Sequence, residues 1–178
     1  MMSERYTAWC KNAATVHGKT GNAVYPAHIL FYRDGVSESQ CGMVLHEEKA
    51  QIEEGCLAAY REYSKNPNGV LPTTLTLIVV TKRHHARFFP LKDTTPNFPN
   101  LPAGTTVDTL VVAPKFTNFY LQSHDSPLGS ARSSHYIVLY DNLKVDGVES
   151  PFTTQELESI VSYRIPSRLI KHSDLTVL

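Results

Sequence analysis

Residues 75–80, with the sequence LTLIVV, constrain the fold more than any other segment of this 178-residue chain. A continuous apolar run rich in β-branched residues is typical of a strand that is covered on both faces of its sheet. Such a strand needs other elements packed above and below it. The run therefore indicates a layered domain built around one buried strand.

The segments around this run alternate between helical and extended patterns. Apolar residues follow helical spacing over residues 3–16 and from 38 to about 64, and the capping box Thr153-x-x-Glu156 opens a last helix. The order of the elements predicts an α/β domain rather than a β-sandwich. The other predicted strands are 28–33, 106–112, 118–124 and 134–140.

Composition is that of an ordinary globular protein. Lys and Arg number 17, Asp and Glu number 17, and 42% of the residues are hydrophobic, so the chain is neither disordered nor strongly basic. No apolar run approaches the ~18 residues of a membrane span, and no membrane partner is expected. The three cysteines are widely spaced, which argues against a disulfide framework or a zinc site. They favour a reducing compartment, the cytoplasm or alternatively the nucleus.

The charges are distributed unevenly although they sum to zero. Segment 82–92, KRHHARFFPLK, contains four Lys or Arg residues, two His and no acid, whereas residues 46–62 contain five glutamates, one Lys and one Arg. A neutral protein needs such asymmetry to present one face to a polyanion. Both segments can also be plain solvated faces, and charge alone favours that simpler interpretation.

Asp34 is the first residue with candidate chemistry. It follows the predicted strand 28–33 and precedes Gly35, and ligands and metals gather at such strand ends in open α/β sheets. A carboxylate there can hold Mg²⁺ through hard oxygen ligands. An Asp-Gly pair is also a common turn, and for an isolated motif the turn is the simpler interpretation.

Two further segments offer cationic or nucleophilic side chains. Residues 82–87, KRHHAR, leave the central strand and can project alternate side chains toward phosphates. Ser123-His124 with Arg132 suggests a hydrolase or a phosphate site, and the lack of a Gly-x-Ser-x-Gly elbow favours phosphate. Cys41 is a candidate nucleophile, but no neighbour in the sequence would lower its pKa, so a buried thiol is expected.

Four long segments together resemble the C-terminal half of the Piwi domain of eukaryotic Argonaute proteins. They are YPAHILFYRDGVSESQ (25–40), LTLIVVTKRHHARFF (75–89), LPAGTTVDTLVVAPKFTNFYLQSH (101–124) and SSHYIVLYDN (133–142), in the order of the family. The resemblance predicts a partial Piwi domain over residues 1–164. An unmatched tail follows at 165–178, and His172 in that tail is given no role.

The resemblance implies a partial RNase H-like (Piwi) domain, with a mixed sheet flanked by helices, that acts in small-RNA-guided RNA silencing. The family holds a guide RNA and cleaves paired target RNA with Mg²⁺ ions held by Asp, Glu, Asp and His. Asp34 matches the Asp of the family motif Y-R-D-G-V-S-E and is expected to be catalytic and a metal ligand. The other three are not matched, so this chain alone is expected neither to hold Mg²⁺ stably nor to cleave.

The family motifs that face the guide RNA carry over residue by residue. The segment K-R-H-H-x-R of the family matches residues 82–87, its S-H motif matches at His124, and the arginine before S-H-Y matches Arg132. Ser133 departs from the proline that usually follows this arginine. The expected RNA-binding residues are Lys82, Arg83, His85, Arg87, His124 and Arg132.

The sequence leaves three functions open. The chain is the RNA-binding portion of an Argonaute, or an RNA endonuclease (slicer) portion that needs carboxylates from elsewhere, or a protein-interaction module. In the third case the helical face between Ile52 and Tyr63 would take Trp-containing peptides of silencing partner proteins. The unmatched carboxylates favour the first function, with a small guide RNA and a target RNA as partners.

Overall fold

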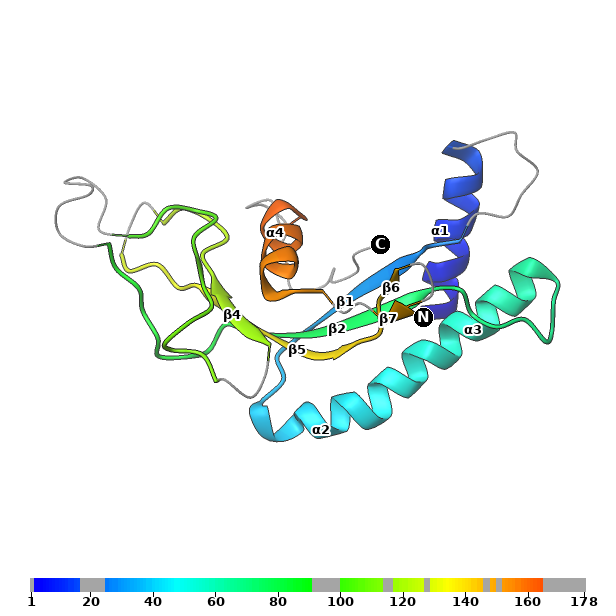
Figure 1. Ribbon diagram of the computed structural model, residues 1–178, viewed down its shortest axis with the longest axis horizontal. Helices are drawn as coiled ribbons and strands as arrows, with labels where there is room; N and C mark the ends of the chain where they lie inside the picture. Colours follow the sequence, from blue (N-terminus) through cyan, green and yellow to red (C-terminus); the bar gives the residue numbers. More distant parts are fainter. Residues whose placement is uncertain are drawn as a thin grey trace.

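The computed structural model describes residues 2–16, 25–90, 100–113, 117–126, 129–145, 148–149 and 152–164. A five-stranded mixed sheet forms its centre, in the order β1-β2-β5-β4-β3 (Figure 1). The parallel pair is β1 (His28–Asp34) and β2 (Thr74–Thr81). The antiparallel part is β5 (Ser134–Asp141), β4 (Asn118–Leu121) and β3 (Thr106–Val107). A two-stranded ribbon, β6 (Lys144–Val145) and β7 (Val148–Glu149), follows β5.

β2 is the strand that the LTLIVV run predicts, and it is buried on both faces. All six residues from Leu75 to Val80 are buried. Leu75, Leu77 and Val79 join one core cluster, while Ile78 and Val80 join the cluster on the opposite face of the sheet. The period of two along the strand therefore divides the core into two layers.

Helices cover each face of the sheet, which confirms the predicted mixed sheet flanked by helices. One face packs against α1 (Met2–Val16) and a long helical stretch made of η1 (Glu38–Gln40), α2 (Cys41–Met43), the π-helical turn η2 (Val44–Glu48) and α3 (Lys49–Ser64). The other face packs against α4 (Thr154–Arg164) (Figure 1). Among the described residues, no helix is long and apolar enough to cross a membrane.

The helix predicted from the capping box at Thr153 is confirmed. The Thr153 amide and hydroxyl both donate to Glu156 Oε2, at 2.9 and 2.8 Å, and the Glu156 amide donates to the Thr153 hydroxyl. Phe152 and Leu157 pack in the same cluster, as a hydrophobic staple requires. The predicted division at residue 164 stays a prediction, because the tail 165–178 lies outside the described residues.

The strand predicted at 106–112 is wrong beyond Val107. Only two residues pair with β4, and the chain then turns at Leu110, whose φ is 65°. Leu110 is fully exposed and Val111 is 54% exposed. Their β-branched and apolar pattern favours a strand, but a pattern specifies a strand only where a neighbouring strand supplies hydrogen-bond partners.

The helical face between Ile52 and Tyr63 belongs to the core, which corrects its expected role as a peptide-binding surface. Ile52, Cys56 and Ala59 are buried between α3, α1 and the sheet. Tyr60 and Tyr63 pack against this cluster, and both meet the ring of Tyr25 edge-on. A face used in this way does not present a groove to a Trp-containing peptide.

Asp141 joins the central strand to the start of α4. Its Oδ1 accepts a hydrogen bond of 2.6 Å from the Thr76 hydroxyl, and its Oδ2 accepts one of 2.7 Å from the Phe152 amide. The Thr76 hydroxyl also lies 2.7 Å from Nε2 of His28 on β1. Burial lowers the pKa of His28, which favours a neutral ring in this network.

Replacing Asp141 with Ala is expected to lower the free energy of unfolding by about 2 kcal/mol, because three donors, the Thr76 hydroxyl and the Leu143 and Phe152 amides, lose a charged acceptor. Urea denaturation followed by circular dichroism measures the change. Asp125→Ala is the matched control, since Asp125 accepts one exposed bond from the Ala103 amide. It is expected to cost less than about 1 kcal/mol, and equal losses for the two variants would contradict the prediction.

Candidate nucleic-acid interface

The strand register brings the predicted site residues to one edge of the sheet. β1 and β2 are parallel, so their carboxyl ends meet, while Thr81 pairs with His135 and Leu121 pairs with Ser134. The segments after β1, β2 and β4 and the segment before β5 therefore lie side by side. We call the six predicted RNA-binding residues there the basic edge: Lys82, Arg83, His85, Arg87, His124 and Arg132.

The residues of the basic edge differ in their solvent exposure and in their side-chain partners. Arg83, His85, His124 and Arg132 are exposed. Neither Arg83 nor Arg132 makes a side-chain hydrogen bond or ion pair with another residue in the described part of the chain. Arg87 is half-buried and donates to the His84 and Ala86 carbonyls, at 2.9 and 2.6 Å. Among the described residues, these two arginines are thus the cations best placed to meet an anion.

His84 anchors the basic segment to the sheet, a role that the sequence analysis did not assign. Its Nε2 lies 2.6 Å from the Ser133 carbonyl, and its ring meets the Tyr120 ring edge-on at 5.1 Å. His85, the next residue, is exposed. β2 ends at Thr81, so strand alternation gave no signal for this role.

Aromatic rings pack against the segment that His84 anchors. The Tyr120 and His135 rings stack at 4.3 Å with an interplanar angle of 11°, and Phe88 meets Tyr120 edge-on at 5.1 Å. Burial, with a smaller contribution from His84, lowers the pKa of His135 to about 4. His135 is therefore a neutral packing residue at pH 7 rather than a cation.

Two buried amide side chains hold the loop that carries Arg132. Asn100 donates to the Ser126 and Gly129 carbonyls and accepts from the Ala131 amide, with distances of 2.7–3.0 Å. Gln122 Oε1 accepts from the Ser133 hydroxyl at 3.0 Å, and its amide nitrogen donates to the His124 carbonyl. The roles of Asn100 and Gln122 were not predicted from the sequence, because a lone Asn or Gln in a polar segment carries no periodic signal.

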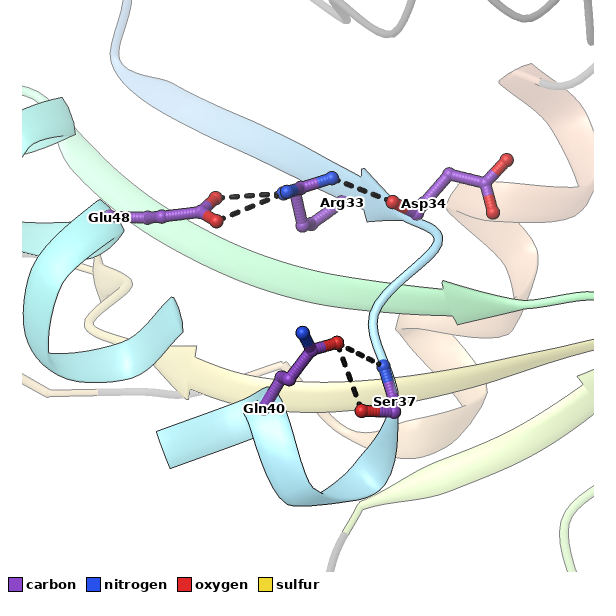
Figure 2. Close-up of polar contacts among 5 residues, drawn as sticks. All are labelled: Arg33, Asp34, Ser37, Gln40 and Glu48. Atoms are coloured by element: carbon purple, nitrogen blue, oxygen red, sulfur yellow. Dashed lines mark hydrogen bonds and ion pairs between the residues drawn. The ribbon is translucent and has the colours of Figure 1, made fainter. Parts of the chain in front are cut away.

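Asp34 ends β1, as predicted, and its carboxylate is engaged by a lysine. Oδ2 of Asp34 lies 2.8 Å from Nζ of Lys82. Arg33, one residue earlier, points to the opposite face of β1, where its Nε lies 2.8 Å from Oε2 of Glu48 (Figure 2). Gly35 follows with a φ of 75°, a conformation that glycine adopts without strain.

The described residues do not make a metal site by themselves. No group of three or more His, Cys, Asp or Glu side chains converges anywhere in these ranges. Asp34 contributes one carboxylate, which is paired with the ammonium group of Lys82. Since Mg²⁺ requires near-octahedral oxygen coordination, Asp34 would need further ligands, and its expected role as a catalytic metal ligand stays a prediction.

All three cysteines are free thiols. Cys10 and Cys56 are buried, whereas Cys41 is half-buried rather than buried as expected. Burial, followed by the nearby Glu38 carboxylate, raises the pKa of the Cys41 thiol. A raised pKa leaves little thiolate at pH 7, so Cys41 is not an activated nucleophile.

Fold and site together define a protein of the RNase H-like class with a cationic sheet edge. The family model described as "Piwi domain" matches residues 7–155, so the chain belongs to the Piwi domain family. It is 40% identical over 136 residues to Protein argonaute 7 of Arabidopsis thaliana, a match that covers 76% of this chain and 12% of that protein. The chain thus spans a small part of this relative.

Solved structures of the same family share the fold. Kluyveromyces polysporus Argonaute with a guide RNA has a TM-score of 0.71 at 26% identity, over 89% of this chain and 18% of that chain. The C-terminal lobe of a budding yeast Argonaute has a TM-score of 0.62 at 25% identity, over 79% and 29%. Drosophila Piwi has a TM-score of 0.61 at 26% identity, over 85% and 18%. The predicted RNase H-like (Piwi) fold class is confirmed.

Stability is expected to fall as the pH falls from about 6.5 toward about 4. Unfolded histidine has a pKa of about 6.5, whereas the pKa of folded His135 is about 4. Between these values the unfolded state binds a proton that the folded state does not, so acid favours unfolding. Below about pH 4 the stability contributed by His135 is lost, and this residue causes no further change of stability with pH.

Urea midpoints at pH 7.5, 5.5 and 4.5 measure this decline. His135→Gln is expected to make it shallower, while His28, whose pKa is also lowered by burial, keeps part of it. His85→Gln is the matched control, because His85 is exposed. The prediction is wrong when His135→Gln and the unaltered protein show the same pH dependence.

Proposed function

We propose that this chain binds the phosphate backbone of a small guide RNA at the basic edge, as the RNA-binding portion of an Argonaute-type silencing protein. The observation that carries the proposal is the strand register, which brings Arg83, His124 and Arg132 from three separate segments to one sheet edge. Membership of the Piwi domain family supports the same function. So does the similarity to an Argonaute with a guide RNA.

Guanidinium groups suit this task because they form paired hydrogen bonds with phosphate oxygens. Arg83 and Arg132 are both exposed. Phosphate contacts position a nucleic acid without reading its bases. Binding at the basic edge is therefore sequence-independent, and base pairing between the guide and a target RNA provides the specificity.

Cleavage of the target is not part of the function proposed for this chain alone. Asp34 is the one residue that the family motif assigns to the catalytic set, and its carboxylate is paired with Lys82. Two-metal hydrolysis needs several oxygen ligands, and carboxylates usually bridge the ions. The slicer function would require ligands that the described residues do not supply.

Replacing Arg83 and Arg132 together with Gln is expected to weaken binding to single-stranded RNA of any sequence. Two lost phosphate contacts should reduce the slope of log affinity against log salt by roughly 1.4 units. Fluorescence anisotropy with two unrelated RNA oligonucleotides over a KCl series measures both quantities.

Lys11→Gln is the matched control, because Lys11 is exposed on α1. α1 packs at the opposite end of the sheet, where Tyr6 bonds to Thr73 just before β2. The control is expected to leave the salt slope unchanged. If Arg83→Gln/Arg132→Gln leaves the salt slope of RNA binding unchanged, the proposed interface is wrong.

The chain incubated with guide, matched target and Mg²⁺ or Mn²⁺ is expected to leave the target intact. Denaturing electrophoresis of end-labelled target provides the measurement. Contaminating nuclease is recognised because Asp34→Ala does not remove its products. Guide-directed cutting that Asp34→Ala abolishes would contradict the expectation.

A further inference from the structure

We propose that Ser133 is a positioning residue that holds Arg83 and Arg132 at a fixed spacing, so that the two cations engage an RNA backbone together. The inference rests on the proposed function and deepens it. Ser133 is buried, with 6% of its surface exposed, and acts through its neighbours rather than by touching RNA. It also departs from the proline that usually follows this arginine in the family, and proline has neither a hydroxyl nor an amide hydrogen.

The strand register places Ser133 between two other segments of the basic edge. On one side, β4 pairs with β5 as far as Leu121, whose partner is Ser134, so Gln122 lies opposite Ser133. On the other side, the antiparallel pairing of β2 with β5 runs to the end of β2. The segment that follows β2 therefore lies alongside Ser133, and three segments that are distant in the sequence meet at this residue.

The side chain of Ser133 makes the first link. Its hydroxyl donates to Oε1 of Gln122 at 3.0 Å, and the side-chain nitrogen of Gln122 donates to the His124 carbonyl at 2.6 Å. Gln122 is buried, with 1% exposed. Its backbone amide donates to the Thr105 carbonyl, and its carbonyl accepts from the Gly104 amide. A buried amide satisfied at both ends has one orientation, so Gln122 fixes the segment that carries His124 relative to Ser133.

The backbone of Ser133 makes the second link. Its carbonyl accepts a hydrogen bond of 2.6 Å from Nε2 of His84, whose ring packs edge-on against Tyr120. His84 directly follows Arg83, and Ser133 directly follows Arg132. One hydrogen bond therefore joins the residues next to the two exposed arginines. A shift of one arginine segment relative to the other requires this bond to break.

The other side of Arg132 is held as well. The amide of Ala131 donates to Oδ1 of the buried Asn100 at 2.8 Å. The residues before and after Arg132 are thus both fixed, although its own side chain is exposed and has no side-chain hydrogen bond or ion pair within the described ranges. The backbone from which this cation projects is set before RNA arrives, which lowers the cost of ordering on binding.

A fixed spacing has a measurable consequence for RNA binding. Once one arginine holds a phosphate, the other arginine meets a second phosphate of the same strand at a high effective concentration, because both arginines belong to one rigid unit. Each contact then strengthens the other. When the link at Ser133 is lost, the two contacts form independently, and the affinity losses of the two arginine variants multiply.

A double-mutant cycle measures this coupling. Arg83→Gln, Arg132→Gln and the double variant are prepared in the unaltered chain and again with Ser133→Ala, which removes the hydroxyl donor. The probe is a single-stranded RNA oligonucleotide of mixed sequence, titrated by fluorescence anisotropy. In the unaltered chain, the double variant is expected to lose about threefold less affinity than the product of the two single losses. With Ser133→Ala, the double loss is expected to equal the product within about twofold, as for independent sites.

Ser133→Ala alone is expected to weaken RNA binding by about fivefold, the cost of ordering one side chain. Ser133→Thr, which keeps the hydroxyl, is expected to retain both the affinity and the coupling. Gln122→Met replaces Ser133→Ala if the latter does not fold, because it removes the same hydrogen bond from the other partner. Circular dichroism at the temperature of the titrations confirms that each variant is folded.

Tyr6→Phe is the matched control for a purely structural effect. It also removes one buried hydroxyl, which bonds to Thr73 at 2.9 Å at the opposite end of the sheet. Tyr6→Phe is expected to lower the urea midpoint but to leave the RNA affinity and the coupling between the two arginines unchanged.

Each result decides the inference. Equal coupling with and without the Ser133 hydroxyl overturns it, and so does an equal loss of coupling in Tyr6→Phe or in Ser133→Thr. If neither Ser133→Ala nor Gln122→Met folds, the contact maintains the fold and the positioning role is wrong. If the arginines weaken binding but are not coupled in the unaltered chain, the proposed function stands and the inference is wrong. If neither arginine affects binding, the proposed interface is wrong and the inference falls with it.

Discussion

Burial of β2 on both faces is the constraint on which the remaining structure depends. The sheet continues on both sides of this strand, with β1 parallel to it and β5 antiparallel to it. The parallel pairing makes Asp34 and Lys82 neighbours, and the antiparallel pairing returns Arg132 to the same edge. A sheet of parallel strands throughout would place Arg132, which precedes β5, at the opposite edge. The mixed sheet is thus the reason that a chain without net charge gathers cations at one place.

The strongest sequence signals proved to be those tied to burial. LTLIVV identified β2, and the capping box with its staple identified the start of α4, because both patterns report local geometry together with a buried face. The segment 106–112 offered β-branched residues without a pairing partner, and only Thr106–Val107 joined the sheet. Propensity alone cannot supply a neighbouring strand.

The site was predictable as a set of residues but not as a set of contacts. Motif matching placed Asp34 and Lys82 in the same functional region, yet a motif carries no information about which charges neutralise each other. Likewise, the helical stripe from Ile52 to Tyr63 was recognised correctly, but a stripe does not tell whether its partner is the protein's own core or another protein. Asn100 and Gln122 gave no signal, because isolated hydrogen bonds leave no period in a sequence.

The position of β2 in the chain also has a kinetic consequence. Its partners are distant in sequence: Thr76 bonds to Asp141, 65 residues later, and His28 on β1 contacts Thr76 from 48 residues earlier. During synthesis the segment LTLIVV therefore emerges long before β5 can cover its second edge. An apolar, uncharged β-forming segment in that state is a site for association between nascent chains. We therefore expect the closure of long loops to slow the folding of this domain, and we expect the exposure of the LTLIVV segment to end once β5 has been synthesised.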